Sequence, residues 1–245
     1  ISPEWFDAVV DAHLKLKIDP RGAEIVSHDP SDQGADAKGL AYRHGILIKD
    51  ALFQDFGDVN DGCDWALAYA IDKRADQLIW DGDGMGVALR RQIGESLSGR
   101  RMQPNMFQGS SDVDFPGMVY EDINEASGKK KTNRETFRNK RAQYYWNLRD
   151  RFKVTHTAVT TGKYTDPETL ISISGEIKSL DVLRSELCRI PLKPNSSGLI
   201  QILSKDEMKR QGIQSPNMAD AVMMSFASHA QQINTMARPV AKKSA

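Results

Sequence analysis

Short apolar runs alternate with amphipathic segments along the first half of the chain and predict a mixed α/β fold. Residues 24–28, 39–44 and 45–56 have the composition of strands. Residues 63–75 and 85–97 carry apolar side chains at helical spacing, and the brief apolar run of residues 77–80 lies between them. A meander followed by a strand between two helices indicates a mixed sheet covered by helices.

Breaks in this pattern divide the chain into a lead-in, one main domain and a tail. Residues 1–20 predict a lead-in helix, with Ser2 as its N-cap and Pro3 at its first position. Residues 21–231 are predicted to form a single domain, a size that allows a sizeable core. Residues 232–245 lack apolar periodicity and are expected to be a flexible tail.

The second half of the chain is expected to combine helices with irregular segments. Residues 109–131 are rich in Ser, Gly, Asp and Lys and predict an excursion whose role stays open. Thr132 and Glu135 have the spacing of a capping box, which predicts a helix to about residue 151. Further predicted elements are a helical segment over residues 166–190 that is interrupted at Gly175, and a last helix over residues 217–231 that is capped at Ser215. A hairpin is predicted over residues 189–203, with a loop at 193–198.

Composition excludes several classes of protein. Hydrophobic residues make up 40% and charged residues 27%, which is typical of a globular domain. No apolar run approaches the roughly 20 residues of a membrane span, so a membrane role is not expected. Cys63 and Cys188 form no CxxC pair and the histidines are scattered, which argues against disulfide or zinc sites. The start at Ile1 instead of Met indicates a piece of a longer protein.

Charge is unevenly distributed, although the formal net charge is zero. Residues 129–153 contain ten Lys or Arg and two acidic residues, a net charge of +8, so the remainder carries −8. An acidic centre beside a basic flank suits an enzyme that acts on a phosphodiester backbone. A solvated helix face is an equally simple interpretation of this segment. The cations predicted to contact phosphates are Lys129, Lys130, Lys131, Arg138 and Arg141.

Three aspartates occupy positions from which their side chains can converge. Asp29 follows the first strand, Asp81 follows residues 77–80, and Asp220 lies in the first turns of the last helix. A single aspartate at a strand end is more often a turn or cap residue than a ligand, so the hypothesis depends on the set. Hard cations such as Mg²⁺ and Mn²⁺ prefer oxygen ligands. Two such ions, roughly 3.5–4 Å apart, can clamp the attacking and leaving oxygens of a phosphodiester.

Other polar residues near these positions have simpler interpretations. Asp83 lies between two glycines and is expected to be a turn residue, with a role as an alternative or outer ligand kept open. Asp36 is expected to cap the turn before the second strand. The glycines after Asp81 lack GxGxxG spacing, so a dinucleotide loop is not predicted. His28 alternates to the opposite side of its strand from Asp29 and is interpreted as structural.

The segments around the three aspartates resemble the nuclease motifs of viral large terminase subunits, the DNA-packaging motor subunits of tailed bacteriophages. Asp29-Pro-Ser-x-x-Gly-x-Asp36-x-Lys-Gly is similar to the first motif, and Asp81-Gly-Asp-Gly-Met-Gly86 is similar to the second. Asp220 lies in Ser215-Pro-Asn-Met-Ala-Asp-Ala-Val, which is similar to the last motif. The resemblance covers nearly all of residues 20–230. The chain departs from the family pattern in lacking the GxxxxGK[ST] loop of an ATPase.

This resemblance implies a ribonuclease H-like fold, with a mixed β-sheet flanked by helices, and a metal-dependent endodeoxyribonuclease. The enzyme would cut concatemeric double-stranded viral DNA during headful genome packaging, in the cytoplasm of the infected bacterium. Asp29, Asp81 and Asp220 would be catalytic and would bind two Mg²⁺ or Mn²⁺ ions. The implied partners are double-stranded DNA, an upstream ATPase domain of the same polypeptide, the small terminase subunit and the portal.

Alternatives to this function stay open. One is a Holliday-junction resolvase or a transposase-like enzyme, which would use the same carboxylates on other DNA shapes. The other is a non-catalytic packaging or portal-docking module, in which the aspartates are only turn residues.

Overall fold

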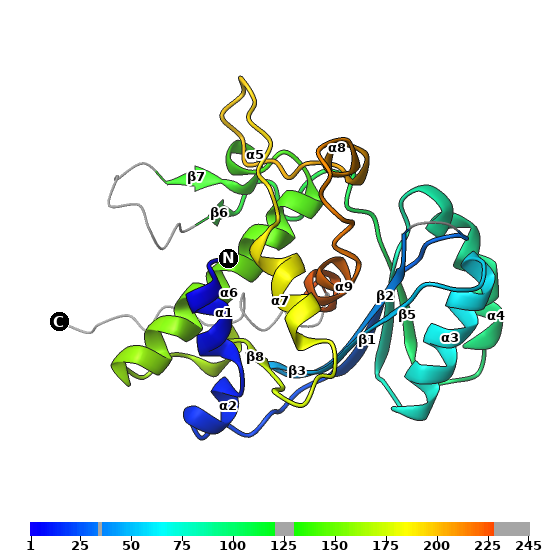
Figure 1. Ribbon diagram of the computed structural model, residues 1–245, viewed down its shortest axis with the longest axis horizontal. Helices are drawn as coiled ribbons and strands as arrows, with labels where there is room; N and C mark the ends of the chain where they lie inside the picture. The colour runs from blue at the N-terminus through cyan, green and yellow to red at the C-terminus, as the bar shows by residue number, and fades with distance from the viewer. Residues whose placement is uncertain (34–35, 121–129, 228–245) are drawn as a thin grey trace.

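A mixed sheet between layers of helices organises the chain, which a computed structural model describes over residues 1–33, 36–120 and 130–227 (Figure 1). Within these residues the main sheet has six strands in the order β5-β4-β1-β2-β3-β8. Their bounds are β1 (Glu24–Asp29), β2 (Lys38–His44), β3 (Leu47–Gln54), β4 (Gln77–Asp81), β5 (Gln103–Phe107) and β8 (Ser172–Ile173). Strands β1, β2 and β3 pair antiparallel, whereas β4, β5 and β8 are parallel to their neighbours. The mixed α/β architecture is as predicted.

Both faces of the sheet are buried, each against its own helices (Figure 1). Helices α3 (Val59–Asp72) and α4 (Arg90–Ser96) cover one face, and α1 (Pro3–Val9), α6 (Lys140–Thr161), α7 (Leu180–Cys188) and α9 (Asn217–Ser225) cover the other. Side chains alternate between these faces along β1, where Ile25 packs with the α6 and α9 side and Val26 with the α3 side. Asp29 therefore lies on the α9 side of β1, and His28 contacts Trp65 on the α3 side, as predicted.

The lead-in is shorter than predicted but begins at the expected residue. The Ser2 hydroxyl accepts a hydrogen bond from the Trp5 backbone N–H at 3.2 Å, and Pro3 opens α1. A second short helix, α2 (Ala12–Lys15), follows Asp11, whose φ of 52° breaks the first helix. Phe6 is buried in the same cluster as α6 and α9, so this segment shares the core of the main domain.

Residues 166–190 do not form the helix that their pattern predicts. They contain a 3₁₀ turn, η2 (Pro167–Thr169), the edge strand β8 and α7. The Ser172 backbone N–H donates to the Ile46 carbonyl at 2.8 Å, and the Ser174 N–H donates to Ile48 at 2.9 Å. This segment completes the free edge of β3, so sheet pairing overrides the local helical preference. The predicted helix over residues 85–97 likewise begins as a 3₁₀ segment, η1 (Gly84–Leu89).

The capping box at Thr132 is present, but the helix that it opens ends within one turn. Helix α5 (Asn133–Thr136) stops at Phe137, which adopts an extended conformation and bridges to Ile200. Asn139 then starts α6 by accepting a hydrogen bond from the Ala142 N–H at 3.0 Å. A long-range backbone pairing therefore divides the predicted single helix into α5 and α6.

Residues 109–131 contain a short hairpin in the part that the structure describes. Strand β6 (Val119–Tyr120) pairs antiparallel with β7 (Lys131–Thr132), while residues 121–129 lie outside the described ranges. The predicted hairpin over residues 189–203 is represented by an antiparallel bridge between Leu192 and Ile202. The last helix, α9 (Asn217–Ser225), ends at Ser225 with Phe226 as its C-cap, earlier than the predicted end near residue 231. The tail predicted at residues 232–245 lies outside the described residues.

Helix α9 packs unusually close to the sheet. A Cβ atom on Gly39 of β2 would lie only 2.1 Å from the Asn217 carbonyl oxygen, so only glycine permits this approach. The Ser27 hydroxyl of β1 donates to the Ala221 carbonyl at 2.6 Å, and the Arg43 guanidinium of β2 donates to the Ser225 carbonyl at 2.7 and 3.0 Å. These contacts lock α9 across β1 and β2. Among the described helices, none combines the length and the apolar character needed to cross a membrane.

Candidate active site

The three predicted aspartates lie at one end of the sheet, where the strands β1 and β4 stop. Asp29 is the last residue of β1 and Asp81 is the last residue of β4, and these strands are adjacent and parallel. Gly39, which allows the close approach of α9, pairs with Asp29 in the β1–β2 register. Helix α9 thereby places Asp220 next to Asp29, and the relative exposures of Asp29 and Asp220 are both 2%. The fold thus brings the three residues to the same end of the sheet, which is the placement that the metal-site hypothesis needs.

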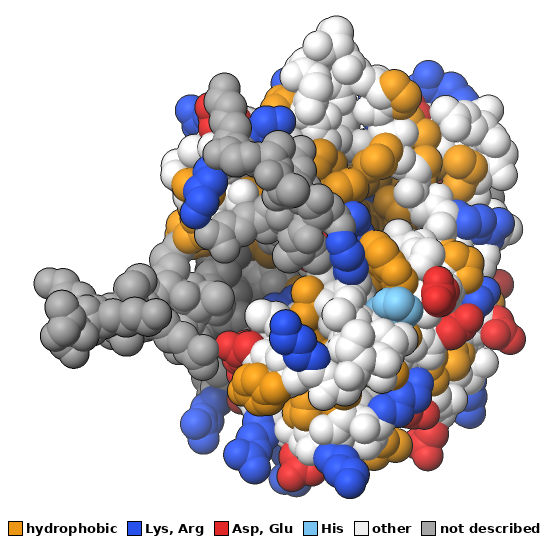
Figure 2. All heavy atoms as spheres, turned by 90° about the vertical axis from the view of Figure 1, so that its left-hand side faces the viewer, with side chains coloured by type: hydrophobic (Ala, Val, Ile, Leu, Met, Phe, Trp, Pro, Cys, Tyr) orange, Lys and Arg blue, Asp and Glu red, His pale blue; other side chains and the backbone are white. Residues whose placement is uncertain are grey.

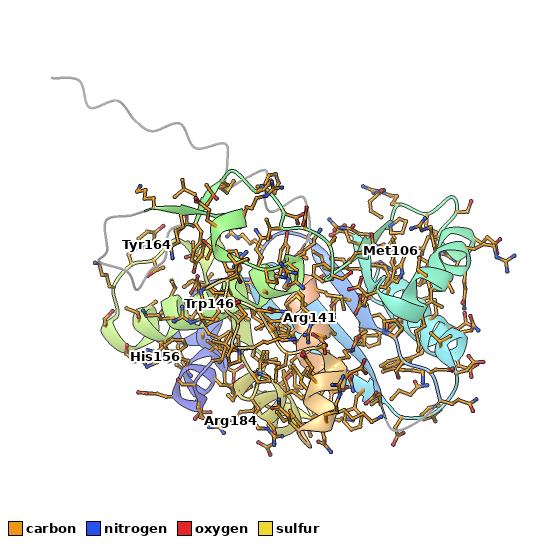
Figure 3. All side chains as sticks on the ribbon, turned by 90° about the horizontal axis from the view of Figure 1, so that it is seen from above. Met106, Arg141, Trp146, His156, Tyr164 and Arg184 are labelled. Carbon is orange, nitrogen blue, oxygen red and sulfur yellow. The ribbon has the colours of Figure 1, made fainter. Side chains whose placement is uncertain are left out.

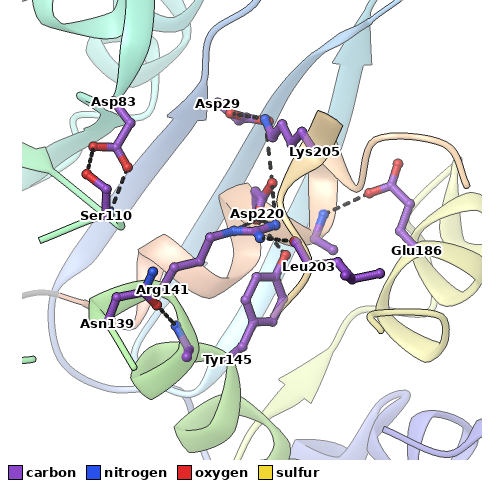
Figure 4. A network of polar contacts seen from close by, with 12 residues as sticks. Asp29, Asp83, Ser110, Asn139, Arg141, Tyr145, Glu186, Leu203, Lys205 and Asp220 are labelled. Carbon is purple, nitrogen blue, oxygen red and sulfur yellow. Dashed lines mark hydrogen bonds and ion pairs between the residues drawn. The ribbon is translucent and has the colours of Figure 1, made fainter. Parts of the chain in front are cut away.

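A lysine that the sequence did not single out lies between two of these carboxylates (Figure 4). The Lys205 ammonium contacts Asp29 Oδ1 at 2.8 Å and Asp29 Oδ2 at 2.6 Å, and it lies 3.5 Å from Asp220 Oδ2. Lys205 opens the short helix α8 (Lys205–Arg210), which Ser204 and Glu207 hold through a capping box. One ammonium group thus offsets the charges of two buried carboxylates.

Asp220 also receives hydrogen bonds from α6. Arg141 Nη2 donates to Asp220 Oδ1 at 3.0 Å, and the Tyr145 hydroxyl donates to the same oxygen at 2.6 Å. Arg141 and Tyr145 are four residues apart, so both face α9 from one side of α6. Arg141 Nη1 also donates to the Leu203 carbonyl at 2.8 Å, which ties α6 to the segment before Lys205.

Asp81 and Asp83 have different local environments. The Asp81 Oδ1 atom accepts a hydrogen bond from the Asp83 backbone N–H at 2.9 Å, which fixes the turn after β4. The Asp83 carboxylate accepts from the Ser110 backbone N–H at 2.8 Å and from the Ser110 hydroxyl at 2.7 Å. Asp83 therefore joins the turn after β4 to the segment after β5, in agreement with the turn-residue interpretation. Asp36 is exposed, and its backbone carbonyl accepts a hydrogen bond from the Ser31 hydroxyl at 2.8 Å.

Burial and neighbouring charges separate the acidities of the three aspartates. Burial raises the pKa of Asp29 to about 7, against the opposing effect of Lys205 and with a further increase from Asp220 and Asp81. Burial likewise raises the pKa of Asp81 to about 6. Burial also opposes ionisation of Asp220, but Arg141, Lys205 and Tyr145 hold the pKa of Asp220 below its ordinary value. Asp220 is therefore the most firmly ionised of the three.

The carboxylates are paired with cations and are not gathered around a single point. Across residues 1–33, 36–120 and 130–227, no three His, Cys, Asp or Glu side chains have an arrangement that could hold a metal ion as they stand. Asp29 and Asp220 instead point to Lys205 and Arg141. The Lys205 ammonium therefore lies between the two carboxylates that the metal-site hypothesis treats as ligands.

The predicted DNA-binding cations are divided between the surface and the site. Lys130, Lys131 and Arg138 are exposed, whereas Lys129 lies outside the described residues. Arg141 lies in the interior beside α9, unlike the peripheral Arg184 and His156 (Figure 3). On the face shown in Figure 2, cationic side chains lie in several separate places among uncharged and acidic ones. The described part of this face therefore has no continuous basic surface.

Comparison with known proteins identifies the family. The nuclease domain of the large terminase subunit gp2 of bacterial virus Sf6 shares 43% sequence identity with the chain, over 92% of the chain and 96% of that domain, with a TM-score of 0.86. The chain belongs to the nuclease domains of viral large terminase subunits. A lysine-to-alanine mutant of the Sf6 domain, solved with manganese, matches with a TM-score of 0.81 and 42% identity. Neither a scan against protein-family models nor a search of curated proteins found a match.

Membership in this family confirms the ribonuclease H-like fold and the nuclease identity that the aspartate motifs implied. Sequence reasoning missed Lys205 and Tyr145, which contact Asp29 and Asp220, and Glu186, whose Oε2 accepts a hydrogen bond from the Ala219 backbone N–H beside Asp220. Ser204 and Glu207 have capping-box spacing, so the sequence contains a signal for α8 and places Lys205 at its first position. Tyr145 and Glu186 had no such signal, because their partners are on a helix distant in sequence.

Proposed function

We propose that this terminase nuclease domain is a metal-dependent endodeoxyribonuclease that cuts concatemeric double-stranded viral DNA during genome packaging. Asp29, Asp81 and Asp220 act as ligands of Mg²⁺ or Mn²⁺, with two ions bound during cleavage. The observation that carries the proposal is the placement of Asp29, Asp81 and Asp220 at the end of the sheet where β1 and β4 stop, with Asp29 and Asp220 sharing the Lys205 ammonium.

The chemistry of the donors supports divalent cations. Carboxylate oxygens are the ligands that Mg²⁺ and Mn²⁺ prefer, and the crowding that raises the pKa of Asp29 and Asp81 would be relieved by added positive charge. The Sf6 relative solved with manganese supports the same choice of metal class. Bound there, the ions would supply positive charge to the attacking and leaving oxygens of a phosphodiester.

The side chains around the carboxylates then have distinct roles. Arg141 and Tyr145 hold Asp220 ionised and aimed toward Asp29 through their hydrogen bonds. Lys205 neutralises Asp29 and Asp220 in the metal-free protein, and bound divalent ions would supply the positive charge that its ammonium provides there. With those ions bound, the Lys205 ammonium would be free to offset the charge of a DNA phosphate.

In this proposal the domain binds DNA through contacts to its phosphates and does not recognise the bases. Lys130, Lys131 and Arg138, with Lys129 beside them in sequence, are the proposed contacts, and Arg141 is reassigned to the carboxylate site. Contacts to phosphates carry no sequence information, so cutting is expected at any sequence.

The proposed partners follow from the family. The Sf6 relative is named as a domain of the large terminase subunit, which supports an ATPase domain in the same polypeptide as the module that supplies DNA to the nuclease. The small terminase subunit and the portal are the other proposed partners, and the infected bacterial cytoplasm is the proposed location. No GxxxxGK[ST] sequence occurs in the chain, so ATP hydrolysis is assigned to that other domain.

Plasmid nicking tests the proposal. The purified chain should nick and degrade plasmid DNA of any sequence with Mg²⁺ or Mn²⁺ and should be inactive in excess EDTA. Asp29→Asn, Asp81→Asn and Asp220→Asn should each lower the rate by at least about 100-fold while a cooperative thermal transition is retained. Asp76→Asn is a matched control, because Asp76 lies just before the start of β4, and Asp81 lies at the other end of this strand.

Each outcome separates the proposal from its alternatives. Cutting in excess EDTA, or wild-type rates in the Asp29 and Asp81 variants, would refute the metal-site assignment. A chain that binds DNA and does not cut it with either metal would favour a non-catalytic packaging module. Cleavage of four-way junctions at a rate far above that of linear duplex would favour a resolvase.

A further inference from the structure

Helix α9, which carries Asp220, begins without a cap from its own sequence. In the part of the chain that the structure describes, the N-cap residue Pro216 contributes no side-chain hydrogen bond, and the predicted cap at Ser215 is not formed. The first amides of a helix have no partner within the helix. Asn217, Met218 and Ala219 are buried, so water is a poor substitute for a cap here.

A carboxylate from α7 takes this place. Glu186 Oε2 accepts a hydrogen bond from the Ala219 backbone N–H at 2.8 Å, as Figure 4 shows, and the Met218 N–H also donates to this carboxylate. Helices α7 and α9 pack against each other, and Leu183 and Leu187 of α7 are fully buried in their shared core. A negative group at this end also interacts favourably with the helix dipole.

The same carboxylate is unfavourable in other respects. Burial raises the pKa of Glu186 to about 7, and the charge of Asp220 raises it further. Placing a second acid close to Asp220 therefore opposes ionisation of both groups. Stability alone would be served as well by a Ser or Asp cap within α9, which would add no charge on α7. Glu186 instead holds the residue directly before Asp220, so it can fix the position of Asp220.

Glu186 makes the side-chain hydrogen bond to the backbone of the first turn of α9, whereas Arg141 and Tyr145 hold the Asp220 side chain itself. Ser27 holds the middle of the helix at Ala221, and Arg43 holds its last residue, Ser225. The amide that Glu186 holds belongs to Ala219, the residue directly before Asp220. A shift of this turn would change the separation between the carboxylates of Asp220 and Asp29.

We propose that Glu186 is a positioning residue of the nuclease site, which caps α9 from α7 and so sets the position of Asp220 relative to Asp29. This inference rests on the proposed role of Asp220 as a metal ligand. Glu186 acts in this proposal because its side chain is long enough to accept the hydrogen bond from Ala219, and not because it is charged.

Three variants separate reach from charge. Glu186→Gln keeps an acceptor oxygen at the same reach but removes the charge. Glu186→Asp keeps the charge but is one methylene too short to cap Ala219, and Glu186→Ala removes both. Asp181→Ala is the matched control. Asp181 lies on α7 like Glu186, and both residues line a cavity of about 260 Å³ beside Val182 and Met208.

Hydrogen exchange of the metal-free protein measures directly whether Glu186 protects the first amides of α9. The amides of Met218 and Ala219 should exchange at least about tenfold faster in Glu186→Asp and Glu186→Ala, and at the wild-type rate in Glu186→Gln and Asp181→Ala. This measurement is independent of metal and of cutting, so it stays informative if Asp220 proves not to be a ligand. Unchanged exchange in Glu186→Asp would overturn the capping role.

Mn²⁺ affinity measures whether Glu186 positions Asp220 for metal binding. The Mn²⁺ concentration for half-maximal binding, measured by calorimetry well below the melting temperature, should rise about tenfold in Glu186→Asp and stay within about threefold of wild type in Glu186→Gln. The opposite pattern, with Asp like wild type and Gln impaired, would show that charge is decisive and would overturn the proposal. Unchanged Mn²⁺ binding in both variants would reduce Glu186 to a structural cap and would also overturn it.

Discussion

Individual buried carboxylates determine how this terminase nuclease domain responds to pH. Asp29 has a folded-state pKa of about 7 and Asp81 of about 6, both above the ordinary value of 3.8. A raised carboxyl pKa means that the protonated form is favoured by folding. The stability associated with that form is fully present below about pH 4 and is lost as the pH rises through the folded-state pKa.

The metal-free protein should therefore lose stability between about pH 4 and pH 7, the window between the ordinary pKa of these two carboxyl groups and their folded-state pKa values. Asp29→Asn removes one of the groups responsible, so its melting temperature should fall less steeply over this range, by the equivalent of roughly 1–3 kcal/mol. Glu186 titrates in the same window and contributes equally to both proteins. Thermal melts in EDTA at several pH values make the comparison, and identical slopes would contradict it.

Lys205 should be more important before metal binds than afterwards. Lys205→Met keeps the aliphatic stem but leaves Asp29 and Asp220 without their shared ammonium, so the metal-free protein should be destabilised by about 1–3 kcal/mol at pH 8. Mn²⁺ should raise the melting temperature of this variant more than that of the wild type, because the ion replaces the missing charge. Lys209→Met, at an exposed position on the same helix, is the control. An equal metal-induced rise in all three proteins would contradict this role.

At the scale of elements, α6 supports Asp220, and two adjacent tyrosines on α6 allow its proposed role at the site to be separated from its role in stability. The Tyr145 hydroxyl donates to Asp220 at 2.6 Å, and the Tyr144 hydroxyl donates to Asp114 at 2.8 Å. Both are buried donors to a carboxylate. They differ in whether that carboxylate belongs to the site.

Removal of each hydroxyl should give similar losses of stability but different losses of activity. Tyr145→Phe and Tyr144→Phe should each destabilise the fold by about 1.5–3 kcal/mol, the usual contribution of a hydrogen bond to a charged group. Only Tyr145→Phe should slow DNA cutting, by about tenfold, since it loosens Asp220. Denaturant unfolding and plasmid nicking measure both quantities, and equal activity of the two variants would show that α6 does not act through Asp220.

At the scale of the whole molecule, the proposed DNA-binding cations should contribute to DNA binding, whereas cations at the end of the sheet opposite to the aspartates should not. Changing Lys130, Lys131 and Arg138 together to Gln should weaken duplex binding, because these cations neutralise DNA phosphates in the proposed complex. The slope of log affinity against log salt should fall by about 0.9 for each phosphate that the variant no longer neutralises. Binding is measured with Ca²⁺ in place of Mg²⁺ at several salt concentrations.

A matched pair at that opposite end controls for net charge. Arg100 and Arg101 are exposed just before β5, at the end of the strand opposite to the one beside Asp81. Their replacement by Gln should leave the salt slope unchanged. An equal reduction by both sets of changes would show that the total charge, and not its location, determines DNA binding.

Local patterns were sufficient for most of the sheet and for the positions of the catalytic candidates. Periodicity located β1 to β4, because alternation and short apolar runs report directly on burial. The strand-end positions of Asp29 and Asp81 followed from the same runs. The motif around Asp220 identified the last helix before any contact was known.

Long-range contacts determined what periodicity could not. Edge strand β8 was predicted as helix, because the free edge of β3 that it completes is far away in sequence. Arg141 was predicted to contact phosphates, but the packing of α6 on α9 pairs it with Asp220. A sequence shows which side chains are charged, whereas the partner of each charge depends on packing between elements. The set of three aspartates was therefore readable from the sequence alone, while Lys205, Tyr145 and Glu186, which hold it in place, were determined by the tertiary structure.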